Sequence, residues 1–77
     1  MSKKFYVILK KYPSLNITTV CLKFGKISKM GSTFESSDCF ESVKAAQGII
    51  NHFQCIGSTA RYRVVDAKTV GTLNITK

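Results

Sequence analysis

Apolar and polar residues alternate near the start of the chain, and this alternation predicts two β-strands. In residues 4–12, one strand face would hold Phe5, Val7 and Leu9, and the other Tyr6, Ile8, Lys10 and Tyr12. In residues 17–24, one face would hold Val20, Leu22 and Phe24, and the other Thr19, Cys21 and Lys23. Pro13 and Ser14 end the first strand, and Gly25 permits a turn after the second. The pattern leaves open whether residues 26–34 add a weaker strand, interrupted at Gly31.

The middle of the chain has a helical period. Ser42 suits an N-cap position, because its hydroxyl can accept a hydrogen bond from a free amide of the first turn. Apolar residues then recur at spacings of three and four and form one stripe: Val43, Ala46, Ile49, Ile50 and Phe53. We therefore predict a helix over residues 42–54. A start near Ser37 is the alternative, since Asp38 and Glu41 would then lie near the positive end of the helix dipole.

Two more strands are predicted over residues 61–66 and 70–75, paired as a hairpin through a short turn at residues 67–69. The element order is then β-β-(β)-α-β-β, and residues 1–77 form a single small α+β domain. We expect two layers, a mostly antiparallel sheet of four to five strands with one helix packed on one face. The sheet face beneath the helix would hold Phe5, Val7, Leu9, Val20, Leu22, Phe24, Tyr62 and Val64.

Charge indicates the kind of partner. The 77 residues carry a net charge of +8, and residues 1–34 contain seven lysines and no acidic residue. Such a field attracts polyanions. Apolar residues make up 44% of the chain, which argues against a disordered basic tail. We expect the partner to be a protein or nucleoprotein complex with an anionic surface, or DNA or RNA.

The expected strand registers bring aromatic and cationic side chains together on the sheet face opposite the helix. The predicted binding residues are Tyr6, Lys10, Tyr12, Lys23, Arg61 and Arg63. Single-stranded nucleic acid uses such faces, because bases stack on rings while cations contact phosphates. The alternative is that these lysines only prevent sheet-to-sheet association. A protein partner would need an exposed apolar patch among the cations. Ile8 and Cys21, in the outward register, favour a protein interface or a homodimer.

Cys21, Cys39 and Cys55 are odd in number and widely spaced, which predicts reduced thiols rather than a disulfide framework. A Cys₃His zinc site with His52 can be drawn, but only His52 and Cys55 have the close spacing that structural zinc normally shows at both ends. A nucleophile set of Cys39, His52 and Asp66 would need a water-excluding cleft, for which so small a chain has little room. We expect no metal, no cofactor and no enzymatic activity.

The longest apolar run, residues 5–9, is far too short to span a bilayer. The basic N-terminus is followed by neither a sustained apolar stretch nor a small-residue cleavage site. We therefore expect no signal peptide, no membrane partner and a cytoplasmic location.

Two segments mark the start of the predicted helix and the strand that follows it: Phe40-Glu41-Ser42-Val43-Lys44-Ala45-Ala46 and Arg61-Tyr62-Arg63-Val64-Val65-Asp66. Together they resemble a recurring pattern in small phage-encoded accessory proteins, with Phe-x-Ser entering a helix and Tyr-x-Val-Val in a hairpin. Such proteins include host-takeover factors and anti-CRISPR-like inhibitors. The resemblance implies a non-enzymatic binder that inhibits or redirects a host nucleoprotein or defence complex in the host cytoplasm. The positive charge departs from the acidic DNA mimics of that group, so duplex mimicry is not expected.

Overall fold

The computed structural model describes residues 4–55, 57 and 60–75, and its α+β fold confirms the predicted class. An antiparallel sheet has the strand order β3-β2-β1-β5, formed by β1 Tyr6–Tyr12, β2 Ile17–Cys21, β3 Ile27–Ser28 and β5 Arg61–Asp66. A small parallel sheet pairs β4 Thr33–Glu35 with β6 Thr72–Asn74. The helices are α1 Val43–Cys55 and α2 Ala67–Val70, and two 3-10 turns are η1 Lys23–Gly25 and η2 Ser36–Asp38.

The centre of the larger sheet is β1, which pairs with β2 on one side and β5 on the other. Val7 and Ile8 are consecutive in β1, so their side chains point to opposite faces of the sheet. Both are 0% exposed. Each face of the sheet is therefore covered at this level. The continuous apolar run of residues 5–9 is typical of a strand buried on both faces.

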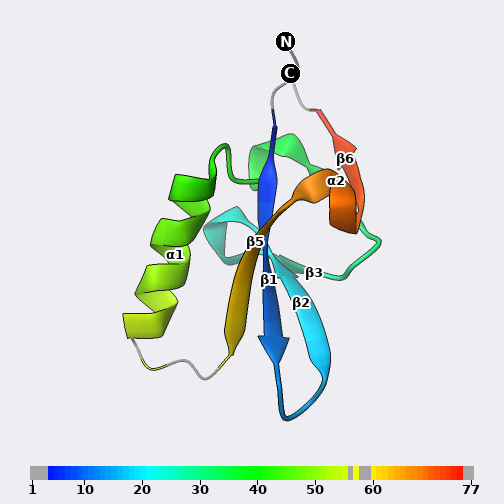
Figure 1. The fold of residues 1–77 in the computed structure, drawn as a ribbon. Coiled ribbons are helices and arrows are strands. Elements are labelled where there is room, and N and C mark those ends of the chain that lie inside the picture. Colours follow the sequence, from blue (N-terminus) through cyan, green and yellow to red (C-terminus); the bar gives the residue numbers. More distant parts are fainter. Residues whose placement is uncertain (1–3, 56, 58–59, 76–77) are drawn as a thin grey trace.

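Different elements cover the two faces, as Figure 1 shows: α1 lies on one side, and α2 with β6 on the other. Beneath α1 is a buried cluster of Ile8, Cys21, Phe40, Ala46 and Ile50. On the opposite face a second buried cluster contains Phe5, Val7, Val20, Phe34, Cys39, Ala67 and Val70. The α1 side of β1 is thus the face of Ile8, and the prediction that the helix packs on Val7 is wrong. The small sheet and α2 bury Val7 instead.

The second predicted strand ends earlier than expected. β2 stops at Cys21, and η1 turns the chain so that Phe24, predicted to lie beneath the helix, is 85% exposed. Residues 26–34 form two short strands, β3 and β4, that belong to different sheets.

The predicted start of the main helix is confirmed. Ser42 Oγ accepts a hydrogen bond from the Ala45 amide at 3.1 Å, and α1 begins at the next residue, Val43. The alternative start near Ser37 is excluded, because η2 is a separate turn. Within the apolar stripe, Ala46 and Ile50 are buried, whereas Ile49 is 40% exposed. Among the described residues, no helix combines the length and the apolar character needed to cross a membrane.

The prediction that the last strand pairs back on β5 as a hairpin is wrong. Asp66 caps α2: its Oδ1 accepts from the Lys68 amide at 3.0 Å, and the Thr69 hydroxyl donates to the Asp66 carbonyl at 2.6 Å. This helical turn redirects the chain across the face of the sheet that α1 does not cover. β6 consequently runs parallel to β4.

We expect Gly71→Ala to lower the free energy of unfolding by about 1–3 kcal/mol, the usual cost of overpacking. A Cβ atom at this position would meet the carbonyl oxygen of Ser32 and lie 2.5 Å from Cε2 of Phe34. The Phe34 ring is buried and cannot move aside freely. Urea unfolding measures the change.

Gly48→Ala in α1 is the matched control, because an added Cβ meets no atom within 4 Å there. Alanine should raise the free energy of unfolding by about 1 kcal/mol through helix propensity alone. If both variants changed stability in the same direction, the packing of β6 against Phe34 described above would be wrong.

A lysine-rimmed apolar groove as the candidate functional site

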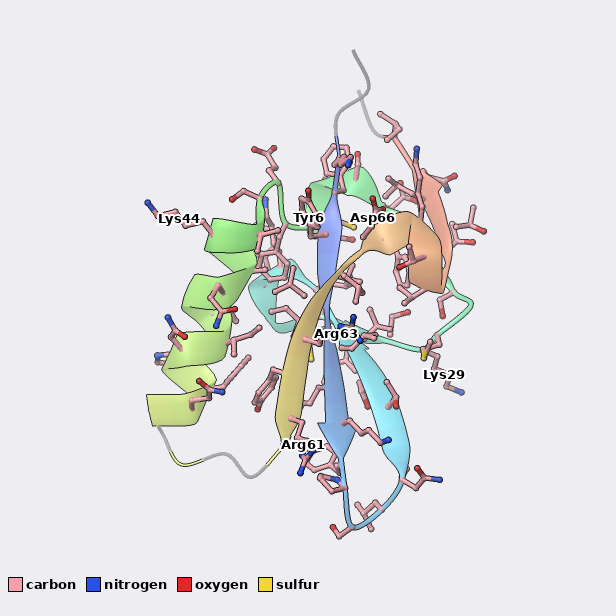
Figure 2. The ribbon with its side chains drawn as sticks, viewed as in Figure 1. Tyr6, Lys29, Lys44, Arg61, Arg63 and Asp66 are labelled. Carbon is pink, nitrogen blue, oxygen red and sulfur yellow. The ribbon has the colours of Figure 1, made fainter. Side chains whose placement is uncertain are left out.

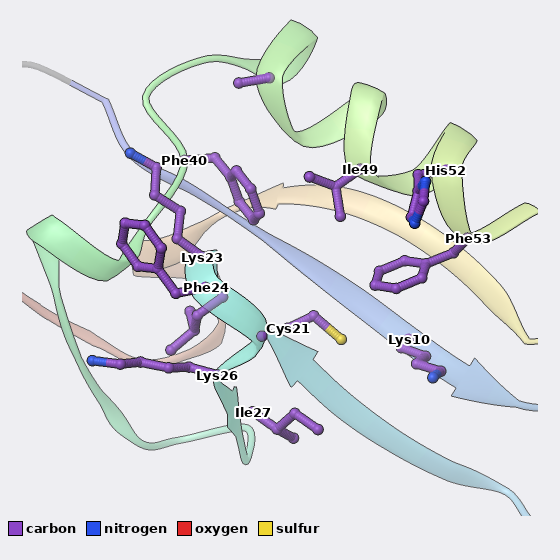
Figure 3. A pocket seen from close by; sticks show the side chains of 13 residues that line it. Lys10, Cys21, Lys23, Phe24, Lys26, Ile27, Phe40, Ile49, His52 and Phe53 are labelled. Carbon is purple, nitrogen blue, oxygen red and sulfur yellow. The ribbon is translucent and has the colours of Figure 1, made fainter.

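A groove of about 730 Å³ lies between α1 and the chain that follows β2, and Figure 3 shows it from close by. From α1 it is lined by Ala45, Ile49, His52 and Phe53. From η1 and β3 it is lined by Lys23, Phe24, Gly25, Lys26 and Ile27. The sheet and the chain before α1 add Lys10, Cys21, Leu22 and Phe40. We call the concave surface formed by these residues the groove.

The walls of the groove expose large apolar side chains. Phe24 is 85% exposed, Ile27 71% and Ile49 40%. They come from three separate elements, η1, β3 and α1, and converge on one concave surface. Single exposed apolar residues are ordinary, but a contiguous group in a hollow is typical of an interaction site.

Phe24 also has an unfavourable backbone conformation. Its φ and ψ are 60° and 27°, in the left-handed region, and Gly25 follows with φ 74°. Glycine occupies this region freely, whereas a bulky L residue is destabilised there. The exposed ring gains little burial to offset that cost. Strain retained at an exposed aromatic residue favours a role in binding over a role in folding.

Lysines surround the apolar walls, and two of them have fixed positions. Lys26 Nζ contacts Asp38 Oδ1 at 2.9 Å, in an exposed ion pair. Lys10 Nζ lies 4.9 Å from the ring centroid of Tyr12, 5.8 Å from that of Phe53 and 5.9 Å from that of Tyr62. The Phe53 and Tyr62 rings stack at 5.6 Å, so Lys10 is placed by three aromatic faces.

The protonation state of Lys10 follows from this environment. A hydrogen bond to the Tyr12 side chain raises the pKa of the Lys10 ammonium above its usual value. The group therefore remains charged throughout the neutral range. Among the described residues, no carboxylate pairs with Lys10. Its positive charge is available to an anionic group that enters the groove.

The six predicted binding residues do not share one face. Lys10 and Lys23 line the groove, and Tyr12 lies beside Lys10. Tyr6 is instead half-buried at the far end of β1, where its amide donates to the Phe40 carbonyl at 2.7 Å.

The two arginines lie on the opposite face of the sheet. The register pairs Arg63 with Leu9 and Arg61 with Lys11, so both arginines point away from α1. Tyr62 and Val64 lie beneath α1 and the arginines opposite, as predicted for β5. The faces of β1 and β2 were assigned the wrong way round, so Lys10 and the tyrosines of β1 lie on the α1 side instead of beside the arginines.

Two further sequence arguments concerned residues that prove to be buried. Ile8 and Cys21 were expected to face outward and to favour a protein interface or a homodimer, but both lie beneath α1. Cys39 is buried on the other side of the sheet, so these two free thiols are not brought together. Burial raises the pKa of both thiols, which keeps them protonated and poorly nucleophilic near neutral pH.

The sets drawn for zinc or catalysis are not assembled by the described side chains. His52 is exposed on α1, whereas Cys39 is 0% exposed in the cluster on the opposite face. The Asp66 carboxylate caps α2. The side chain of Cys55 lies outside the described part. Within that part, no group of three or more His, Cys, Asp or Glu residues could hold a metal ion.

The predicted binding residues include only Lys10 and Lys23 of the groove and miss its exposed apolar walls, among them Phe24, Ile27 and Ile49. The signal that could have identified Phe24 is its position in Lys23-Phe24-Gly25-Lys26. A glycine directly after the aromatic residue, between two lysines, indicates a turn rather than a continuing strand.

We expect Phe24→Asn to raise the free energy of unfolding by about 1 kcal/mol, because asparagine tolerates the left-handed conformation. Phe24→Leu is the matched control, since it removes the ring but keeps a residue that disfavours this conformation. Its stability should stay close to that of the wild type in urea unfolding. A loss of stability in Phe24→Asn would show that the ring stabilises the fold by packing, and would contradict the strain argument.

Comparison of this chain with protein-family models, with curated proteins and with solved structures found no match. The function is therefore argued from the geometry and charge of the groove.

Proposed function

We propose that this chain is a small non-enzymatic binding protein that captures an acidic, apolar-anchored segment of a partner protein in the groove. One observation carries the proposal: Phe24, Ile27 and Ile49 expose apolar surface in a hollow that lysines surround. An exposed apolar patch among cations favours a protein partner over nucleic acid.

The chemistry of the walls supports protein over nucleic acid as the occupant. Of the three exposed apolar side chains in the walls, Phe24 has a ring on which a base could stack, but Ile27 and Ile49 are aliphatic and have none. Leucine, isoleucine or phenylalanine side chains of a partner would instead bury against them and against Phe24. Apolar anchors in a concave, desolvated centre usually contribute most of the binding energy of a protein interface.

The charge of the groove determines the polarity of the segment. Lys10 and Lys23 would meet carboxylates that flank the apolar anchors. Complementary charge of this kind increases the association rate and excludes basic partners. Lys10 contributes most directly, because the aromatic rings hold its ammonium in place before the partner arrives.

The proposed biological setting comes from the resemblance to small phage-encoded accessory proteins. On that basis, the acidic segment belongs to a host nucleoprotein or defence complex, which the bound protein inhibits or redirects. The burial, charge and shape of the groove favour an acidic, apolar-anchored segment in any biological setting.

The test starts from a displayed library of 15-residue peptides, with Leu, Ile or Phe at spaced positions and all residue types between them. We expect selection on the wild-type protein to enrich Asp and Glu beside the apolar positions. The selected peptide is then measured by calorimetry against three variants. Phe24→Asn and Ile49→Ala should each weaken binding about 10–30-fold, as loss of an anchor does. Lys23→Gln should weaken binding by a smaller factor. That factor should be larger at low salt than at high salt, because salt screens the lost charge.

Leu15→Asn is the matched control, because Leu15 is 63% exposed but does not line the groove. It should leave peptide affinity unchanged. Selection of peptides without acidic residues would contradict the proposal. The proposal would also be contradicted if a single-stranded oligonucleotide displaced the peptide and if Phe24→Asn weakened binding of the oligonucleotide as much as binding of the peptide. The groove would then be a nucleic-acid site.

A further inference from the structure

A second cationic surface lies on the sheet face that α1 does not cover. The register places Lys11 directly opposite Arg61, and Arg63 follows two residues along β5 on the same face. All three side chains are exposed. We call Lys11, Arg61 and Arg63 the arginine patch. It is separated from the groove by the thickness of the sheet, because Lys10 and Lys11 point to opposite faces.

Among the described residues, no carboxylate forms an ion pair with this patch. Asp38 pairs with Lys26, Asp66 caps α2, Glu35 accepts a hydrogen bond from Asn74 at 3.5 Å, and Glu41 directly precedes the Ser42 cap of α1. Asp66 lies opposite Tyr6, at the other end of β1 from Lys11. Figure 2 shows the same separation, with Arg61 near the β1–β2 hairpin and Asp66 at the opposite end of the sheet.

Like charges directly opposite each other on neighbouring strands destabilise a sheet. Lys11 and Arg61 have this arrangement, and β-branched or neutral residues would suit the same positions better. The patch therefore destabilises the fold, and no contact among the described residues compensates for this. A polyanion bound across the patch would remove the repulsion.

We propose that the arginine patch binds the phosphate backbone of nucleic acid, at a site separate from the groove. Arg61 and Arg63 repeat about 7 Å apart along β5, close to the rise of two phosphates along one strand of a nucleic acid. Guanidinium groups bind phosphate in a bidentate fashion, which favours arginine over lysine at such positions. The strand neighbours Leu9 and Thr18 are half-buried and supply no stacking ring. The contact is therefore to the backbone and independent of sequence.

The test is fluorescence anisotropy with a labelled 20-nucleotide single strand and the corresponding 20-base-pair duplex, between 50 and 200 mM NaCl. Three phosphate contacts predict a slope of log affinity against log salt near −2 to −3, a loss of roughly 20–40-fold over this range. Lys11→Gln, Arg61→Gln and Arg63→Gln should each reduce the slope by about 0.7–0.9, leaving a loss of roughly 7–12-fold. Similar results for two unrelated sequences are expected.

Two controls have the same change in net charge. Lys44→Gln removes an exposed lysine on α1, and Lys23→Gln removes a groove lysine. Neither should alter the slope, and urea unfolding should show all five variants folded. The proposal is overturned if the controls reduce the slope as much as the patch variants, which would indicate attraction by net charge alone. It is also overturned if poly-L-glutamate, at the same concentration of negative charge, displaces the labelled oligonucleotides as well as unlabelled oligonucleotide does. The same holds if neither probe binds at 50 mM salt.

Discussion

Burial of β1 on both faces is the constraint on which the rest of the structure depends. Val7 and Ile8 are adjacent and both fully buried, so a chain of only 77 residues must cover each side of its sheet. α1 covers one side, and α2 with the small β4–β6 sheet covers the other. Small domains bury a limited fraction of their surface, so two covers cannot both extend along the full strand. The sheet end beyond Leu9 remains accessible from both sides.

The two cationic surfaces follow from this partial cover. Where the cover ends, β1 continues as Lys10 and Lys11, whose side chains alternate between the faces. Lys10 joins the aromatic rings beside the groove, and Lys11 joins Arg61 and Arg63. The few carboxylates take part in local structure elsewhere, as in the Asp66 cap and the Lys26–Asp38 pair. Four of the twelve cationic residues, Lys10, Lys11, Arg61 and Arg63, therefore lie where the sheet is least covered.

The sequence predicted elements better than it predicted their packing. Local signals, such as the Ser42 cap and the alternation along β1, depend on neighbours in the chain and were interpreted correctly. Which face of β1 and β2 meets α1 depends on packing between distant segments, and this assignment was reversed: Ile8 and Cys21, not Val7 and Val20, lie beneath the helix. The apolar run of residues 5–9 did contain the signal for a strand covered on both faces. An α2 turn after Asp66 depends on a side-chain cap that composition alone does not reveal.

Both proposed sites contain a local conflict that the fold does not need. Phe24 is bulky, exposed and left-handed, and Lys11 faces Arg61 across a strand pair. Natural sequences are mostly consistent between local preference and global fold, and exceptions concentrate at functional positions. Because the two surfaces lie on opposite faces, occupation of one leaves the other open. If both proposals hold, the protein would hold an acidic protein segment and a nucleic-acid backbone at once. Each contact would then raise the effective concentration for the other, which suits a nucleoprotein target better than either contact alone.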